Sequence, residues 1–357
     1  MKKSTRTFLF ALFAILFLVI TPAIVRYSQG YRIDWQNKTI VQTGALFLEP
    51  RPAPVEVYLN GEFIKKSSFV FQNIYLGNLL PKKYLVEVKK EGYSPWQKKL
   101  AVSQKLVSEA KNITLFPLPA DRQAGLPDPN KINKISENLR DFFPSPSGKY
   151  FVFLKNTQVP KMSLYSLNDQ REILALNIQS GFVNYAIEDI QWDSDSTNIT
   201  FSLNDSAKRL FFSYNVENAT ISKPLKDSPS EKVSYDAERT IVARDRKKIL
   251  LIKKNELAVY WLEDTKTQPF RNAGDYEQIA SAREQKIEDA VWFSKNNEYV
   301  IFSTENTISA TELDGRDNRN THVLINSGAK KIFYEEKNEI MYFLDNNTLY
   351  SLSLKYK

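Results

Sequence analysis

The sequence contains no cysteine and a single histidine, His322, among 357 residues. The absence of cysteine excludes disulfide bonds, thiol nucleophiles, thiolate zinc sites and lipid attachment through an N-terminal cysteine. One histidine excludes most histidine-based metal centres and catalytic triads. Because His322 lies in a polar stretch, we expect an exposed side chain rather than a ligand, and we expect no metal and no cofactor. Aspartate and glutamate are abundant, so carboxylate chemistry is not excluded by composition.

Helical periodicity is also scarce. After residue 25, only residues 276–284 are typical of a short helix. Aromatic residues make up 13% of the chain and both signs of charge are well represented. This composition is typical of a folded chain rather than a disordered one, and the pattern predicts an all-β protein.

The N-terminus combines a basic patch with a long apolar run. Lys2, Lys3 and Arg6 precede residues 8–25, which contain no charged residue. Such a run is just long enough to cross a hydrocarbon core of about 30 Å as a helix. A cleaved signal peptide has the same layout, but this run is longer than usual and no clear A-x-A site follows it. We therefore predict a single-pass signal anchor in the cell membrane, with the N-terminus cytoplasmic and the remainder extracytoplasmic.

A strand-rich segment follows the predicted anchor. Residues 54–59 alternate between apolar and polar, as a half-buried strand requires. Asn60-Gly61 comes next and predicts a type I′ hairpin turn. Residues 84–89, which are closed by Gly92 and Tyr93, and residues 112–116 predict two further strands.

This segment resembles a PEGA domain. The resemblance is carried by residues 46–50, 53 and 55–61, and then by residues 79–88 and 91–93, about a fifth of the chain. It implies a small β-sandwich of the kind found on bacterial surface proteins, often between a membrane anchor and other modules. The chain departs from the family pattern at turns: Pro52 stands where glycine is usual, the 81–83 turn lacks its glycine, and Ser67-Ser68 replaces Thr-Pro.

Lysine pairs recur along the same segment. They are candidates for contact with an anionic cell-wall polymer or with lipid headgroups. They are equally typical of side chains that keep strand edges soluble and unpaired, and both interpretations stay open. Nucleic acid is not expected as a partner of an extracytoplasmic domain. The candidate residues are Lys65, Lys66, Lys82, Lys83, Lys89, Lys90, Lys98 and Lys99.

From residue 139 onward a phrase built on an aromatic residue recurs at intervals of roughly 42 to 57 residues, close to the spacing of propeller blades. The aromatic positions are Phe143, Trp192, Tyr235, Trp292 and Tyr334. The repeats predict a β-propeller of degenerate four-stranded blades, about five or six in number. A strand from the preceding linker is one way to close the ring.

The first phrase, with Pro146 and Gly148, resembles the blade motif of TolB-like or WD40-like propellers of bacterial envelopes. The resemblance covers some 220 residues and implies the fold more than any function. We expect Trp192 and Trp292 to pack between blades, with ligand stacking as the alternative. The carboxylate pairs 188–189 and 288–289 recur at equivalent repeat positions, which favours a structural role over a catalytic pair.

The predicted organisation has six parts and a non-catalytic function. They are a cytoplasmic tail (1–7), a signal-anchor helix (8–25), a juxtamembrane segment (26–43), a PEGA-like β-sandwich (44–117), a Pro-rich linker (118–138) and a propeller-like repeat domain (139–357). We expect a membrane-anchored binding or scaffolding protein of the bacterial envelope, not an enzyme, that engages a protein partner or a wall polymer. The alternatives are an envelope glycan or peptide hydrolase using propeller carboxylates, and the ectodomain of a membrane sensor complex. The oligomeric state stays open.

Overall fold

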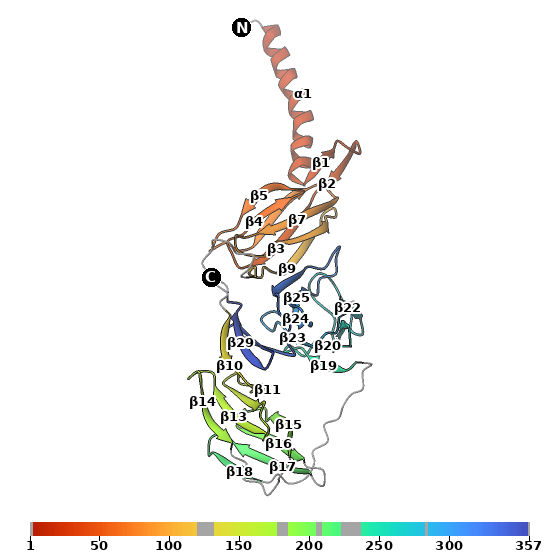
Figure 1. Ribbon diagram of the computed structural model, residues 1–357. Coiled ribbons are helices and arrows are strands. Elements are labelled where there is room, and N and C mark those ends of the chain that lie inside the picture. Colours follow the sequence, from red (N-terminus) through yellow and green to blue (C-terminus); the bar gives the residue numbers. More distant parts are fainter. Residues whose placement is uncertain are drawn as a thin grey trace. The chain divides into compact units, whose positions relative to one another are not determined.

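A computed structural model describes residues 3–119, 132–176, 185–204, 209–222, 237–282 and 285–355. In these residues one N-terminal helix is followed by secondary-structure elements that are all strands (Figure 1), which confirms the predicted β-rich architecture. The chain divides into two compact units. The N-terminal unit comprises residues 1–116 together with two later segments, 264–272 and 314–320, and the repeat unit comprises the rest.

Helix α1 spans Lys3–Ser28, so it extends beyond the predicted 8–25 at both ends. Its Phe8–Ser28 stretch is long and apolar enough to cross a membrane, and its most apolar window is not buried against any other part of the protein. At 1.5 Å per residue these 21 residues span about 31 Å, which matches the hydrocarbon thickness of a bilayer. A two-stranded hairpin, β1 (Tyr31–Asp34) and β2 (Thr39–Gln42), follows the helix. It lies in the juxtamembrane segment 26–43, for which the sequence predicts no secondary structure.

Residues 44–114 form two sheets around one core. The strands are β3 (Gly44–Arg51), β4 (Glu56–Leu59), β5 (Glu62–Lys66), β6 (Ile74–Leu79), β7 (Lys83–Lys89), β8 (Trp96–Ala101) and β9 (Val107–Thr114). The sheet orders are β6-β3-β9, in which β3 and β9 run parallel, and β5-β4-β7-β8. Inward-facing residues of both sheets, such as Leu46, Val57 and Trp96, share one buried cluster. The alternation that predicts half-buried strands therefore places one face of each sheet in a common core.

The hairpin between β4 and β5 has the backbone that Asn60-Gly61 predicts. Asn60 and Gly61 have φ angles of 52° and 86°, and Leu59 pairs with Glu62 across the turn. Both residues tolerate positive φ at low cost, as a type I′ turn requires. The Asn60 side chain also accepts a hydrogen bond from the Leu85 N–H at 3.0 Å, which fastens the turn to β7.

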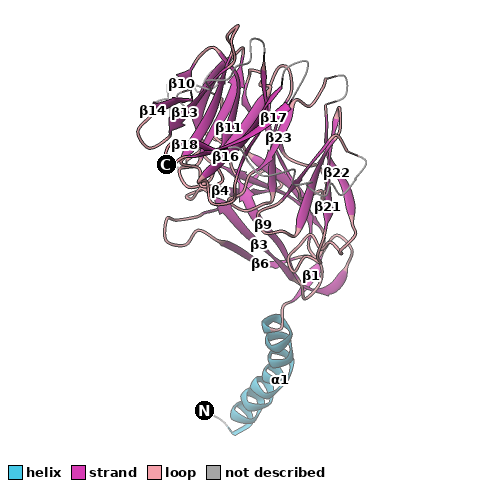
Figure 2. Ribbon diagram, turned by 90° about the horizontal axis from the view of Figure 1, so that it is seen from below, coloured by secondary structure: helices cyan, strands magenta, loops and turns pink. Residues whose placement is uncertain are grey.

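The described part of the repeat unit contains five four-stranded sheets, an arrangement consistent with the predicted propeller (Figure 2). Four sheets are built from consecutive strands. They are β11 (Leu139–Pro144), β12 (Tyr150–Lys155), β13 (Lys161–Ser166) and β14 (Arg171–Leu176); β15 (Ala186–Trp192), β16 (Asn198–Asn204), β17 (Arg209–Asn215) and β18 (Thr220–Ser222); β19 (Arg239–Val242), β20 (Lys248–Ile252), β21 (Glu256–Trp261) and β22 (Tyr276–Ser281); and β23 (Asp289–Trp292), β24 (Tyr299–Ser303), β25 (Ile308–Glu312) and β26 (Thr321–Ile325).

The fifth sheet joins the two ends of the repeat unit. Strand β10 (Asn133–Ser136) pairs with β29 (Thr348–Ser353), which continues to β28 (Ile340–Asp345) and β27 (Lys331–Glu335). Strand β10 lies inside the segment 118–138 that the sequence assigns to a linker, and it pairs with the C-terminal strands as the linker strand considered above would. The short helix expected over residues 276–284 is absent from the described part of that range. Strand β22 forms there because pairing with β21 completes a sheet.

Each of the five sheets has a strand-to-strand turn that contains a residue with a φ between 52° and 65°. This turn joins the first two strands in four sheets and joins β27 to β28 in the fifth. These residues are Gly148, Ser196, Arg246, Asn297 and Glu339. Only the first is glycine, so the repeated backbone is more regular than the repeated sequence. Pro146 is exposed in the first of these turns.

Candidate ligand-binding groove

The two sheets of residues 44–114, called the sandwich below, carry an open groove of about 680 Å³. It is formed by the chain entering β4, the end of β5, and the end of β7 with the turn that follows it. Its lining residues are Pro54, Val55, Glu56, Lys66, Lys89, Lys90, Glu91, Tyr93 and Pro95. Three members of the predicted lysine set therefore meet in one place. Lys66 comes from β5, and Lys89 and Lys90 come from the end of β7 and the turn after it.

Strand register explains why two of these lysines converge. Glu56 pairs with Lys66 of β5 on one side and with Lys89 of β7 on the other, so the three side chains form a row across one face of the sheet. The Lys66 Nζ lies 3.1 Å from Glu56 Oε1. The Lys89 Nζ lies 3.1 Å from a Glu87 oxygen and 4.6 Å from the centroid of the Tyr58 ring.

Hydrogen bonds to Glu56 keep this row charged. The Lys66 ammonium and the Tyr58 hydroxyl both donate to the Glu56 carboxylate. They lower the pKa of Glu56, so its carboxylate stays ionised at neutral pH. The groove lining thus carries three ammonium groups against the two carboxylates of Glu56 and Glu91, which leaves it net positive.

Lys90 differs from its neighbours because no carboxylate among the described residues pairs with it. Its ammonium donates to the Ala53 carbonyl at 3.3 Å and lies 5.3 Å from the centroid of the Tyr93 ring. Gly92, at φ 77°, turns the chain so that the Tyr93 N–H donates to the Lys90 carbonyl at 3.1 Å. Burial lowers the pKa of Lys90. A partly desolvated cation beside an aromatic ring is a site that an anionic group would stabilise.

The groove therefore combines a flat, weakly polar surface with fixed charges. Pro54, Tyr93 and Pro95 supply the flat groups, and the lysines supply hydrogen-bond donors. Within the described ranges, no cluster of three or more histidine, aspartate or glutamate side chains is placed to hold a metal ion. With these side chains the groove is suited to bind an extended ligand that carries anionic groups.

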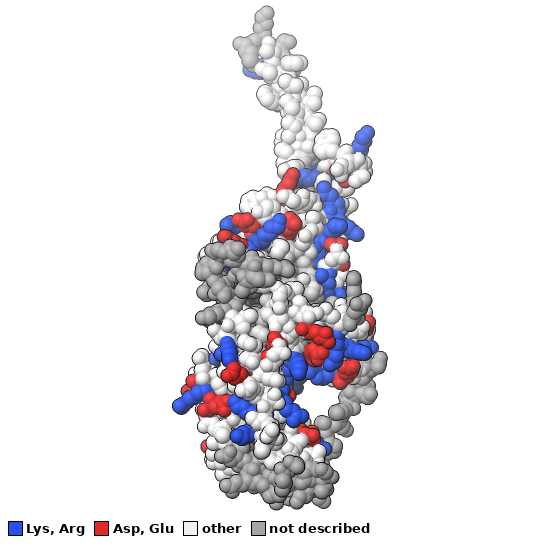
Figure 3. Space-filling view, viewed as in Figure 1, with Lys and Arg blue, Asp and Glu red and all other residues white. Residues whose placement is uncertain are grey.

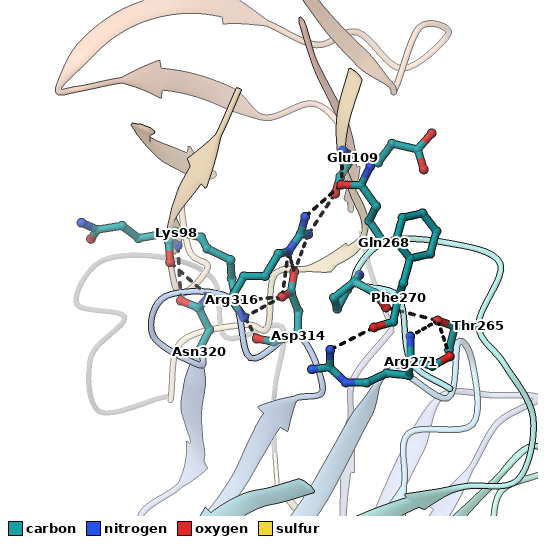
Figure 4. Close-up of polar contacts among 11 residues, drawn as sticks. Lys98, Glu109, Thr265, Gln268, Phe270, Arg271, Asp314, Arg316 and Asn320 are labelled. Atoms are coloured by element: carbon teal, nitrogen blue, oxygen red, sulfur yellow. Dashed lines mark hydrogen bonds and ion pairs between the residues drawn. The ribbon is translucent and has the colours of Figure 1, made fainter. Parts of the chain in front are cut away.

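Lys98 corrects the prediction for the lysine set. Its side chain is 0% exposed, so it cannot face a wall polymer or lipid headgroups. Alternation along β8 places Lys98 on the same side as Trp96 and Leu100, and its ammonium donates to the Asp314 carbonyl at 2.6 Å (Figure 4). A carboxylate oxygen of Asp314 lies 3.7 Å away. The other four candidates outside the groove are Lys65, Lys82, Lys83 and Lys99.

The two later segments of the N-terminal unit bind the edge strands β8 and β9. Asn320 exchanges two hydrogen bonds with the Gln97 backbone, at 3.3 and 3.2 Å. Gln268 does the same on β9, accepting from the Glu109 N–H and donating to the Val107 carbonyl, both at 3.2 Å. These side chains occupy backbone groups that an exposed strand edge would leave open. Nothing in the local sequence of residues 314–320 indicates that this segment binds β8 and β9.

Arg316 joins these contacts into one polar cluster (Figure 4). Its guanidinium donates to the Glu109 carbonyl at 2.9 Å and to the Asp314 carboxylate at 2.7 Å. Burial acts to raise the pKa of Asp314. The hydrogen bonds from Arg316 and the charges of Lys98 and Arg316 outweigh this effect, and the pKa is lowered. Asp314 is therefore a partly buried anion, with 17% of its side chain exposed, held between two cations.

The two predicted tryptophans link neighbouring sheets of the repeat unit. The Trp192 indole donates to the Phe143 carbonyl at 3.1 Å, and the Trp292 indole donates to the Ile241 carbonyl at 3.0 Å. Each bond joins the first strand of one sheet to the first strand of the sheet before it. Tyr235, a further predicted aromatic position, lies outside the described residues.

The recurring carboxylates also have partners in the repeat unit. Asp289 is buried, pairs with Arg239 and accepts from the Ile332 N–H at 2.8 Å. Asp189 accepts from the Ser202 hydroxyl at 2.7 Å and pairs with Arg209. Both carboxylates are thus engaged by donors of the sheets.

His322 contradicts the sequence expectation of an exposed side chain. It lies on β26 and is 9% exposed, and burial lowers its pKa to about 4. The polar stretch before it forms a loop, but His322 itself belongs to the strand that follows. Loop composition alone does not indicate where that strand begins.

No family model matches the chain, and no curated protein matches it. Among solved structures it is similar to the propeller domain of Cps50 (Swd1) from Myceliophteria thermophila, with 7% identity, a TM-score of 0.25, and coverage of 59% of this chain and 64% of that one. It is similar to an uncharacterized protein of Listeria monocytogenes, with 12% identity, a TM-score of 0.34, and coverage of 74% and 86%.

A third similar structure is a gluconolactonase from Xanthomonas campestris, with 9% identity, a TM-score of 0.28, and coverage of 76% of this chain and 82% of that one. The prediction that the chain is not an enzyme is corrected by this finding, because an enzyme is among the structures it resembles. That prediction rested on missing motifs, and missing motifs do not exclude catalysis on a propeller-like fold.

Proposed function

We propose that the chain is a single-pass, membrane-anchored binding protein of the bacterial cell envelope, whose sandwich binds an anionic wall polymer. In this proposal the sandwich is PEGA-like and the repeat unit is a TolB-like propeller held outside the cytoplasm. The observation that carries the proposal is the groove in which Lys66, Lys89 and Lys90 converge beside Tyr93.

The anchor supports the location of the groove. Helix α1 contains an apolar stretch of bilayer length, and basic residues precede that stretch in the sequence. Basic residues are retained on the cytoplasmic side, so the sandwich is delivered to the opposite side. There it stands within reach of polymers that lie close to the membrane surface.

The charges of the groove favour a polymer over a neutral glycan or a folded protein partner. Its lining has a net positive charge, and Lys90 has a partly desolvated ammonium with no carboxylate partner in the described part of the chain. A phosphodiester or carboxylate of a polymer would supply that partner. Repeated anionic groups would engage Lys66 and Lys89 in turn, since their pairing with Glu56 and Glu87 is partly solvent-exposed and exchangeable.

The proposal is tested with the full chain in nanodiscs of a neutral phospholipid. The probe is poly(glycerol phosphate), with dextran as the uncharged control, and binding is followed by isothermal titration calorimetry. We expect Lys90→Gln to weaken binding about 10- to 100-fold, the range for losing a charged hydrogen bond. Lys65→Gln is the matched control, because Lys65 is exposed on β5 outside the groove. Equal effects of the two substitutions, or no binding of the polymer, would contradict the proposal.

A further inference from the structure

The hairpin of β1 and β2, which directly follows helix α1, exposes several apolar side chains. Trp35 at its tip is 80% exposed, and Ile40 and Ile33 are 69% and 49% exposed. Ile33 and Ile40 are directly paired across the two strands, so they lie on the same face. A two-stranded hairpin is marginally stable in water without a surface to pack against. The hairpin forms a sheet of its own, so this apolar face requires another partner.

The hairpin is fastened to the last turn of the helix. Arg32 donates to the Tyr27 and Tyr31 carbonyls, both at 2.8 Å, and its guanidinium lies 3.6 Å from the centroid of the Tyr27 ring. At the base of the hairpin the Thr43 N–H donates to the Gly30 carbonyl at 2.9 Å. These contacts fix the hairpin beside the end of α1 (Figure 1).

This attachment determines the depth at which the hairpin lies relative to a bilayer that α1 crosses. If Phe8–Ser28 crosses the hydrocarbon core, Tyr31 follows within three residues of its end. A four-residue strand is about 13 Å long, and the headgroup layer on each side of a bilayer is about 5–7 Å thick. A hairpin that runs along the surface therefore fits within the headgroup layer over its whole length.

The residue types suit that layer. Tryptophan and tyrosine are enriched at membrane–water interfaces, and lysine and arginine contact lipid phosphates. Trp35 is at the tip, Lys38 is exposed beside it, and Arg26 lies in the last turn of the helix. Figure 3 shows a largely uncharged surface along the helix and basic atoms at the tip of the hairpin.

We infer that the β1–β2 hairpin lies in the interfacial layer of the same membrane that α1 spans, with Trp35, Ile33 and Ile40 inserted among the lipids. This inference rests on the proposed anchor. The occupant of the apolar face is the lipid surface itself, because the face is continuous with the end of the spanning helix. The hairpin then acts as a second membrane contact that restricts rotation of the sandwich about the helix axis.

The test uses single cysteines, which the chain permits because it has none of its own. Full chains carrying Trp35→Cys, Lys65→Cys or Phe17→Cys are labelled with the fluorophore NBD and reconstituted into phosphatidylcholine–phosphatidylglycerol vesicles. Some of these vesicles contain lipids with a spin-label quencher. We expect the label at 35 to emit at shorter wavelength than the label at 65 and to lose most of its emission to the quencher. The label at 65 should keep its emission.

Position 17 separates the two possible failures. Quenching at 17 without quenching at 35 leaves the anchor intact and overturns the hairpin inference. No quenching at 17 overturns the anchor and the hairpin inference together. A second variant, Ile40→Cys, reports on the same face without removing Trp35, so a label at 40 that is as water-exposed as the label at 65 also overturns the inference.

Discussion

Acidification should destabilise the repeat unit through its single histidine. Burial lowers the pKa of His322 from 6.5 to about 4. Above pH 6.5 the imidazole is neutral in both the folded and the unfolded chain and makes no difference to stability. Between pH 6.5 and 4 the unfolded chain binds a proton that the folded chain excludes, so the free energy of unfolding falls as pH falls. The difference between the two pKa values corresponds to about 3 kcal/mol, of which about 2 kcal/mol is lost by pH 5.

Because the chain has one histidine, its titration is directly observable. The full chain is prepared without a histidine tag and with ¹³C-labelled histidine, and the imidazole resonance is followed by NMR from pH 8 to pH 4. We predict a midpoint near pH 4, and a chemical denaturation midpoint that falls between pH 7 and pH 5. The variant His322→Gln should lose about 2 kcal/mol of that pH dependence. A midpoint near 6.5 in the folded chain would refute the reasoning.

Three other perturbations test the packing. Arg246→Gly should stabilise the repeat unit by about 0.5–1 kcal/mol because it removes left-handed strain, whereas Gly148→Ala should cost about 1 kcal/mol, since a Cβ there would lie 3.3 Å from the Glu335 side chain. Denaturant titrations that show the same sign for both changes would refute this. Lys98→Met should cost about 2 kcal/mol, the range for hydrogen bonds to charged groups, and speed hydrogen exchange across 314–320, because it leaves the partly buried Asp314 carboxylate with one cation fewer. Unchanged exchange would argue against the cluster. Trp292→Phe should lower the thermal midpoint through a lost hydrogen bond worth about 1 kcal/mol, and an unchanged midpoint would count against that bond.

Local patterns in the sequence predict those parts of the fold that short-range physics determines. Asn60-Gly61 fixes a hairpin because both residues tolerate positive φ. The apolar stretch within α1 is visible because a bilayer-spanning helix needs consecutive apolar residues. The repeated aromatic phrases predict four-stranded sheets, because four repeats each supply one sheet and the last supplies three strands of the fifth.

Features that depend on pairing between distant residues could not be located from the sequence. The sequence offers a linker strand as one way to close the ring, but the position of β10 depends on the edge that β29 provides more than 200 residues later. Lys98 reads as one of several exposed lysines, but the partner that buries it lies at Asp314. The groove likewise depends on strand register, which brings Lys66 and Lys89 to either side of Glu56.

The most direct test of the account is photocrosslinking from inside the groove. The full chain with the photoreactive residue p-benzoylphenylalanine in place of Tyr93 is incubated with poly(glycerol phosphate) and irradiated. The same residue in place of Tyr75, which is exposed outside the groove lining, is the control. The account predicts polymer crosslinks from position 93, competed by unlabelled polymer and reduced by Lys90→Gln, and few from position 75. Equal crosslinking from both positions, or none from position 93, would contradict it.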